Sequence, residues 1–450
     1  MNKTSVQIEL TTRQLTILLG TLFLVNLLLL AGTWSATLYF NEHGWGGNPS
    51  LLKNVLFQLN LALENVVATW YSSMLLLTTA VMAGVCFLAD RQEGTGRRQL
   101  FFSYGWLVFM GVFTLLSFDE MGSVHEYFGK DAYNEQADQF TRYAGLVVLY
   151  SAIALVAGFM VAFGLVHLRR VPWSFVLVGA GVLLFISNPF QEHFEWGFYQ
   201  RGADRPVLLL LLEEGSELFG TLCFLAATVA YAAHVTRRRP GGSGLPAIRV
   251  TATVSRKPVQ GGVLAMLGAM AVLLVGLQLV VGNVDDPRLG IPQNWLPSAI
   301  AFAVALLSLY LFASLPRDAA RGVSFFGLLA GVALALSAYY GSNLYATKGL
   351  VMGTALSAFL LMLVVGVSSG LLVTTKDART RLGIGAWTLF TGLALTVGRA
   401  YSAELAFVGF ACLLASLLAY VLRQQLLASA QASVRAFAAA SRMTEMGSVV

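Results

Sequence analysis

Charge is what this sequence has least of. Only 12% of its 450 residues are Asp, Glu, Lys or Arg, whereas 57% are hydrophobic. Soluble domains typically carry about 25% charged residues. The composition therefore excludes an ordinary soluble domain and indicates a polytopic membrane protein. Basic residues are not interleaved with aromatic ones in any patch, so we expect no binding of RNA or DNA.

Cysteine is scarce, and motifs for zinc or nucleotide binding are missing. Cys86, Cys223 and Cys412 form no CxxC pair and no zinc-ligand spacing, and all three fall in apolar runs. The sequence has no GxxxxGK[ST] loop, so it does not bind ATP through that motif. The first apolar run is too long for a signal peptide and lacks a small-residue cleavage pattern. We expect it to be an anchor.

Long apolar runs are abundant. About twelve of them approach the roughly 20 residues that a helix needs to cross a bilayer. The predicted spans are 13–40, 66–89, 99–118, 142–166, 173–192, 207–233, 259–282, 296–315, 322–341, 351–374, 382–398 and 403–422. The predicted fold class is all-α, with two halves of six transmembrane helices each.

Lys and Arg predict the orientation of these spans. With the N-terminus inside, the five inner loops hold 16 Lys and Arg residues and the six outer loops hold 8. We therefore expect both termini in the cytoplasm of a bacterium and a multi-pass protein of its inner membrane. The predicted domains are a first half (1–236), a linker containing RRRPGGSG (237–258), a second half (259–422) and a cytoplasmic helix (423–450).

Polar residues inside the spans are few. Asn26 lies in the middle of the first span, where a hydrogen bond between helices is the expected role. The segment LLKNVLFQLNLALENVV after this span has apolar residues at helical spacing and is predicted to lie along the outer membrane interface. In the second half, small residues indicate close helix packing, and Ser337 is one of a few polar groups that could line a cavity.

Carboxylates and histidines concentrate at the outer ends of three predicted spans. They are Asp119, Glu120, His125, Glu126, Glu192, His193, Glu195, Glu213, Glu214 and Glu217. At helical spacing the polar residues of each segment recur on one face, provided that Pro189 does not break the second helix. Because all three segments reach the outer boundary, they can converge. The other histidines, His43, His167 and His234, stand singly in a loop or at inner span ends, where anchoring or solvation is expected.

Three interpretations of this outer cluster remain open. Like-charged carboxylates hold one another protonated unless a cation compensates them. Mixed carboxylate and imidazole ligands suit a divalent transition metal such as zinc, iron or manganese. The candidate metal ligands are Glu120, His125, His193, Glu213 and Glu217, and the candidate sensing residues are Asp119, Glu120, Glu126, Glu192, Glu195 and Glu214. The alternatives are ion pairs with Arg142, Arg201 and Arg205, or a cluster that responds to pH.

The tail, 422–450, is predicted to be one helix with an apolar seam through Val434 and Phe437 that suits a partner helix. Its last residues, RMTEMGSVV (442–450), resemble the start of the dimerisation helix in two-component sensor histidine kinases. In that family such a run leads into the phospho-accepting histidine. The resemblance implies a homodimeric membrane input region, with a kinase core and a response regulator downstream.

Two other functions fit the sequence. A metal-dependent membrane hydrolase at the outer leaflet would use a metal-bound water, with one carboxylate as the general base. A secondary transporter would fit two halves of six spans, although the second half lacks the charged or broken-helix residues expected at a midplane substrate site.

Overall fold

The protein is a bundle of long apolar helices. The computed structural model describes residues 3–44, 50–63, 66–93, 103–122, 139–199, 205–237, 247–255, 295, 298–306, 333–334 and 337–338. The first six predicted spans correspond to α1 (Thr12–His43), α3 (Val67–Glu93), α5 (Gly105–Gly122), α7 (Gln139–Val166), α8 (Pro172–Tyr199) and α9 (Val207–Arg237). Four of these, α1, α3, α8 and α9, are long and apolar enough to cross a membrane. A membrane-embedded helical protein is therefore confirmed.

The second half and the tail contribute little to what is described. The six spans predicted after residue 258 and the helix predicted at 423–450 lie mostly or wholly outside the described residues. The total of twelve spans and the orientation of the termini therefore stay predictions.

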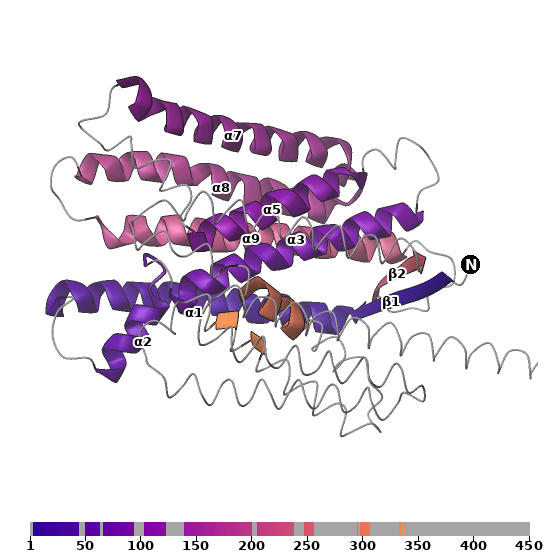
Figure 1. Ribbon diagram of the computed structural model, residues 1–450, viewed down its shortest axis with the longest axis horizontal. Coiled ribbons are helices and arrows are strands. Elements are labelled where there is room, and N and C mark those ends of the chain that lie inside the picture. Colours follow the sequence, from indigo (N-terminus) through magenta and orange to yellow (C-terminus); the bar gives the residue numbers. More distant parts are fainter. Residues whose placement is uncertain are drawn as a thin grey trace, which may run out of the picture.

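Helix α9 is the centre of the described bundle. It packs against α8, α3 and α1, while α5 packs on α3 and α7 packs on α8. The axes of the long helices are roughly aligned, and the short helix α2 (Leu51–Leu59) lies across them (Figure 1). Following the predicted orientation, we call the end where α1, α5 and α8 terminate the outer end, and the opposite end the inner end.

Close contact between α8 and α9 depends on two glycines. A Cβ atom at Gly181 would lie 2.8 Å from the ring of Phe224, and one at Gly220 would lie 2.6 Å from the ring of Phe185. Each helix thus has a glycine at the point where a phenylalanine of the other helix packs against it. Small residues at such positions let helices approach closely in a membrane, where packing rather than water exclusion drives association.

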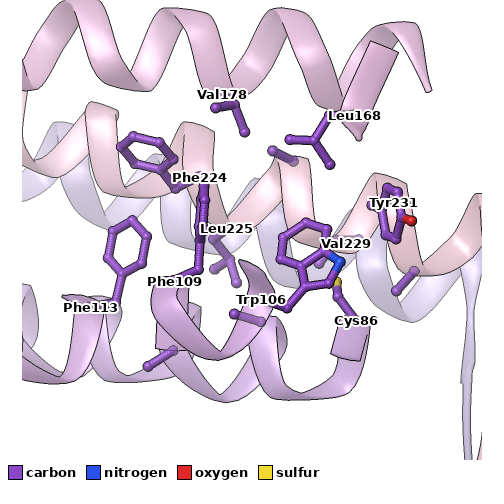
Figure 2. Packing of buried hydrophobic residues seen from close by; sticks show 14 of the residues in the cluster. Cys86, Trp106, Phe109, Phe113, Leu168, Val178, Phe224, Leu225, Val229 and Tyr231 are labelled. Atoms are coloured by element: carbon purple, nitrogen blue, oxygen red, sulfur yellow. The ribbon is translucent and has the colours of Figure 1, made fainter. Parts of the chain in front are cut away.

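Aromatic side chains fill the space between α5 and α9. Trp106, Phe109 and Phe113 of α5 are fully buried and face Phe224 and Leu225 of α9 (Figure 2). The rings of Phe113 and Phe224 meet edge to face, with centroids 5.0 Å apart. This geometry is a preferred one for aromatic pairs. The apolar core separates the polar groups at the two ends of the bundle.

Asn26 has the structural role that the sequence predicts. Its side chain is fully buried, donates from Nδ2 to the carbonyl of Leu218 at 3.2 Å, and accepts from the Tyr71 hydroxyl at 2.8 Å. One amide therefore joins α1, α9 and α3. Satisfying its polar atoms in this way removes the cost of burying them.

A β ribbon at the inner end departs from the all-α prediction. Strand β1 (Lys3–Thr11) pairs antiparallel with β2 (Ala247–Ser255), which lies within the predicted linker. Both segments alternate apolar and polar residues, and the register sets Ile8 opposite Val250 and Glu9 opposite Arg249. An isolated two-stranded ribbon is marginal in water. Contacts of β2 with α3 and α9 supply the support that such a ribbon needs.

Serine and tryptophan side chains join the two halves of the chain. Trp70 on α3 donates from Nε1 to Ser337 Oγ at 2.9 Å, and Trp295 donates to Ser117 Oγ on α5 at 3.1 Å. Ser298 and Ser337 exchange hydrogen bonds with each other's backbone carbonyls. Ser337 is fully buried in these contacts. It therefore acts here as a packing residue between halves.

Candidate functional site

The outer ends of α8 and α9 share a polar contact. Asn188, which is 8% exposed, donates from Nδ2 to Glu217 Oε1 at 2.8 Å and accepts from the Ser216 hydroxyl. Helix α8 continues through Pro189 to Tyr199, so the proline does not break the turn. Because the helix is continuous, Asn188, Glu192 and Glu195 occupy backbone positions on one face of α8, as predicted for an unbroken helix.

Glu213, one of the predicted metal ligands, forms an ion pair with Arg205 in the segment before α9. The two side chains are 16% and 21% exposed, respectively. Arg205 is one of the three arginines named in the ion-pair interpretation. At this position the structure therefore supports charge compensation by a protein cation.

The structure describes only some of the remaining residues of the outer cluster. Asp119 and Glu120 lie partly buried in the last turn of α5, and Glu214 lies partly buried on α9. His125 and Glu126 fall outside the described residues. Glu192, His193 and Glu195 belong to α8, but their side chains are not described. Among the described side chains, no group of three or more His, Cys, Asp and Glu could hold a metal ion. The metal site stays a prediction.

At the inner end, four helices converge on one carboxylate. Asp90 of α3 is 1% exposed. Its Oδ2 accepts from Trp106 Nε1 of α5 at 3.1 Å and lies 2.8 Å from Nε2 of His167, directly after α7. Its Oδ1 accepts from the hydroxyl of Tyr231 on α9 at 2.6 Å. We call Asp90, Trp106, His167 and Tyr231 the inner quartet.

One proton must lie between Asp90 and His167. Two lone pairs 2.8 Å apart would repel, so either Nε2 carries a hydrogen directed at the carboxylate, or Oδ2 carries one directed at Nε2. The Tyr231 oxygen, 2.7 Å from the same Nε2, is placed to accept from it. Because the Tyr231 hydrogen is directed at Asp90 Oδ1, all of these contacts are satisfied when Nε2 carries the hydrogen and shares it between Asp90 Oδ2 and the Tyr231 oxygen.

Aromatic rings surround the imidazole and exclude water from it. His167 is 1% exposed, with the rings of Phe163, Trp106 and Tyr231 at centroid distances of 5.0, 6.3 and 5.4 Å. Figure 2 shows Trp106 close to Tyr231 at this end of the core, beside Cys86. Ionisable groups buried in a membrane protein are expensive and usually functional. This makes the inner quartet the strongest candidate site among the described residues.

The expectation of a solvated or anchoring His167 is therefore wrong. The sequence places this histidine just before Leu168, Arg169 and Arg170, a context typical of a solvated loop. In the structure, the 3-10 turn η2 (Leu168–Arg170) connects α7 to α8. The His167 side chain, just before this turn, is buried among the inner ends of the helices. The sequence does not indicate a buried role for Asp90, because it precedes Arg91 at the end of a predicted span, where a single acidic residue is usually solvated.

The two described cysteines lie inside long apolar helices, α3 and α9, as the sequence predicts. Cys86 is fully buried and donates from Sγ to the carbonyl of Thr228 at 3.2 Å, and Cys223 is partly buried. Both are free thiols in helices that are long and apolar enough to cross a membrane. Cys412 lies outside the described residues.

One family model matches part of the chain. Residues 21–235, from within α1 to the last turn of α9, are similar to a domain of unknown function (DUF8692). No curated protein and no solved structure matches the chain. The match includes all members of the inner quartet as well as Glu213 and Glu217.

Proposed function

We propose that this chain is the membrane-embedded input region of a sensor histidine kinase in a bacterial inner membrane. The resemblance of residues 442–450 to the start of a kinase dimerisation helix is the sequence support. The structural support is the construction of α9. It contacts polar groups at both ends of the bundle and packs through apolar surfaces between them.

Helix α9 is suited to carry a displacement from one end to the other. Its 31 residues span about 46 Å at the α-helical rise. Near its start, Glu213 pairs with Arg205 and Glu217 accepts from Asn188. Near its end, Tyr231 donates to Asp90. A change at the outer pairs would move a rigid element whose other end is hydrogen-bonded in the inner quartet.

The inner quartet is the single observation that carries the proposal. It joins the inner ends of α3, α5, α7 and α9, and β2 packs against α3 and α9 at that end. Strand β2 belongs to the connection toward the second half of the chain. A rearranged quartet would therefore alter the support of β2, and the second half would pass the change to the tail.

The first experiment is to read the coding sequence beyond Val450. We expect a His-Glu pair within the next turns of the same helix. A stop codon, or a continuation without such a histidine, would remove the sequence basis of the proposal.

Phosphorylation of the full-length protein tests the structural basis. Replacing Tyr231 by Phe removes one hydrogen bond to Asp90 and keeps the ring, so we expect autophosphorylation in vesicles to change several-fold. Tyr39→Phe on α1 is the matched control, because Tyr39 stacks on His43 at the outer end. Equal activities for wild type and Tyr231→Phe would contradict a role for the quartet in signalling.

The dimeric state has its own test. A parallel homodimer through 423–450 predicts disulfide cross-linking in membranes for Val434→Cys or Phe437→Cys. An intact protein that cross-links at neither position would argue against this arrangement.

A bound metal at the outer end would be the input device of this sensor. Purified protein should then contain nearly stoichiometric zinc, iron or manganese by elemental analysis. His193→Ala or Glu217→Ala should lower that content, whereas Glu42→Ala on the exposed end of α1 should not. A metal-free wild type would leave the ion-pair and pH-sensing interpretations.

A further inference from the structure

Helix α2 differs from the other described helices in direction and in exposure. It lies across the long helices at the outer end of the bundle (Figure 1). Ser50 caps its start by accepting from the Lys53 amide at 3.1 Å. None of its nine residues is buried. A helix this short is not stable by itself in water, so its surroundings must hold it.

The uncovered residues of α2 are mostly apolar. Leu51 is 82% exposed, Leu52 58%, Val55 45% and Phe57 39%. The only charged residue of the helix is Lys53. Leu51, Leu52 and Val55 share one face of α2, and Lys53 lies on the opposite face. An apolar face with a basic residue opposite it is typical of helices that bind at a lipid surface.

The position of α2 along the bundle matches the outer boundary of a bilayer. If α1 enters the hydrocarbon at its start, about 20 of its 32 residues cross it, which puts the outer boundary near Thr33. Thr33 is the residue of α1 that bonds the end of α2. The next residue, Trp34, is 45% exposed, and tryptophan is enriched at membrane interfaces. Helix α3 begins its span at Val67, close to the same level.

Hydrogen bonds fasten α2 to both neighbouring spans. The Thr33 hydroxyl donates to the Leu59 carbonyl at 3.2 Å and accepts from the Leu61 amide at 3.0 Å. Gln58 Oε1 accepts from the Val67 amide at 3.0 Å, which caps the start of α3. A Cβ at Gly32 would lie 2.9 Å from Leu59 Cβ, so α1 and the end of α2 are in close contact. A displacement of α2 is therefore passed to α1 and α3.

We infer that acyl chains of the outer leaflet cover the apolar face of α2, and that α2 transmits changes in outer-leaflet lipid packing to α3. The bilayer is the occupant that fits, because α2 lies across the spans at their boundary and exposes apolar residues there. Helix α3 carries Asp90 at its other end. Lipid packing as the sensor's signal rests on the proposed function, whereas the contact with lipid and its transmission to α3 do not.

Labelling tests the contact with lipid. The full chain, with its three native cysteines replaced by alanine, is reconstituted in phosphatidylcholine vesicles and labelled with a polarity-sensitive fluorophore at Leu52→Cys or Glu42→Cys. Glu42 is exposed on the part of α1 beyond the boundary and serves as the control. We expect the label at 52 to emit at shorter wavelength, to be quenched by brominated acyl chains and to be protected from aqueous iodide. Iodide quenching equal to that at 42 would overturn the inference.

Amide hydrogen exchange tests the transmission. Lysophosphatidylcholine added from outside loosens the outer leaflet, and exchange at the first turns of α3 should then accelerate several-fold. Thr33→Val, which loses the hydrogen bonds to Leu59 at the end of α2 and to Leu61 in the connection from α2 to α3, should abolish most of that response. Thr37→Val, whose hydroxyl bonds only within α1, should keep it. No response in wild type, or the full response in Thr33→Val, would overturn the inference. None of these measurements involves phosphoryl transfer, so their outcome is independent of the kinase proposal.

Discussion

The two ends of the bundle hold their ionisable groups in opposite ways. At the outer end, Glu213 is compensated by Arg205 with both side chains partly exposed, and Glu217 accepts from Asn188. At the inner end, Asp90 and His167 are each 1% exposed and satisfied by side chains from four helix ends. The number of carboxylates in the sequence is higher at the outer end. The degree of burial, which sets the energetic consequence of each charge, is higher at the inner end.

This difference identifies which end fixes the fold. A partly exposed pair exchanges its partners for water at little cost, and its contribution is screened by salt. A buried pair cannot do so, because water does not reach the carboxylate that loses its partner. We therefore expect the inner quartet to determine how four helix ends are held together, and the outer pairs to exchange partners more easily.

The largest effect should come from breaking the inner quartet. His167→Leu leaves Asp90 buried without its imidazole partner and should lower the free energy of unfolding by about 3–5 kcal/mol. Unfolding in mixed micelles with increasing dodecyl sulfate measures this. His43→Leu is the control, because His43 is exposed at the end of α1. Adding Asp90→Asn to His167→Leu should restore part of the loss, and equal stabilities for His167→Leu and His43→Leu would refute the comparison.

An intermediate effect should come from the packing that joins the two ends. Gly220→Ala places a methyl group against the Phe185 ring and the Leu184 Cβ, which should cost about 1–3 kcal/mol by overpacking. Gly179→Ala is the matched control, since nothing lies within 4 Å of its new Cβ. Because alanine is a better helix former than glycine, the control should be neutral or slightly stabilising. The same micelle unfolding assay compares the two, and a stable Gly220→Ala would show that α8 and α9 separate easily.

The smallest effect should come from the outer ion pair. Glu213→Gln removes the charge facing Arg205 and should cost no more than about 1 kcal/mol. High salt should shrink the difference between variant and wild type, whereas it should leave the His167→Leu difference nearly unchanged. A loss at Glu213 as large as that at His167, and independent of salt, would show that the two ends are alike.

Much of the fold could be predicted from the sequence because hydropathy is a local property. The sequence predicts the first span at 13–40, and α1 covers Thr12–His43. It predicts the sixth span at 207–233, and α9 covers Val207–Arg237. The helix at Leu51–Leu59 follows from apolar spacing in the same way. Asn26 could also be interpreted correctly, because one amide in an apolar run must find a partner on another helix.

The inner quartet could not be predicted, because it depends on contacts that periodicity does not report. Asp90 and His167 are 77 positions apart, and both adjoin basic loops. Tyr231 and Trp106 are common residues at span ends. Only the packing of α3, α5 and α9 around the end of α7 makes these four residues neighbours. The outer cluster can be recognised in the sequence because its carboxylates are close together along the chain. Closeness along the chain does not show whether a carboxylate is buried.

The two strands of the β ribbon are synthesised at very different times. Thr11 of β1 meets Ala247 of β2, so the first strand has no partner until 236 further residues have been made. At roughly 5–20 residues per second, the ribosome needs roughly 10–50 s to reach that point. During this interval β1 has no partner strand while the helices from α1 to α9 are made. The ribbon then closes the amino-terminal half into a loop, so its formation reports that insertion of the half is complete.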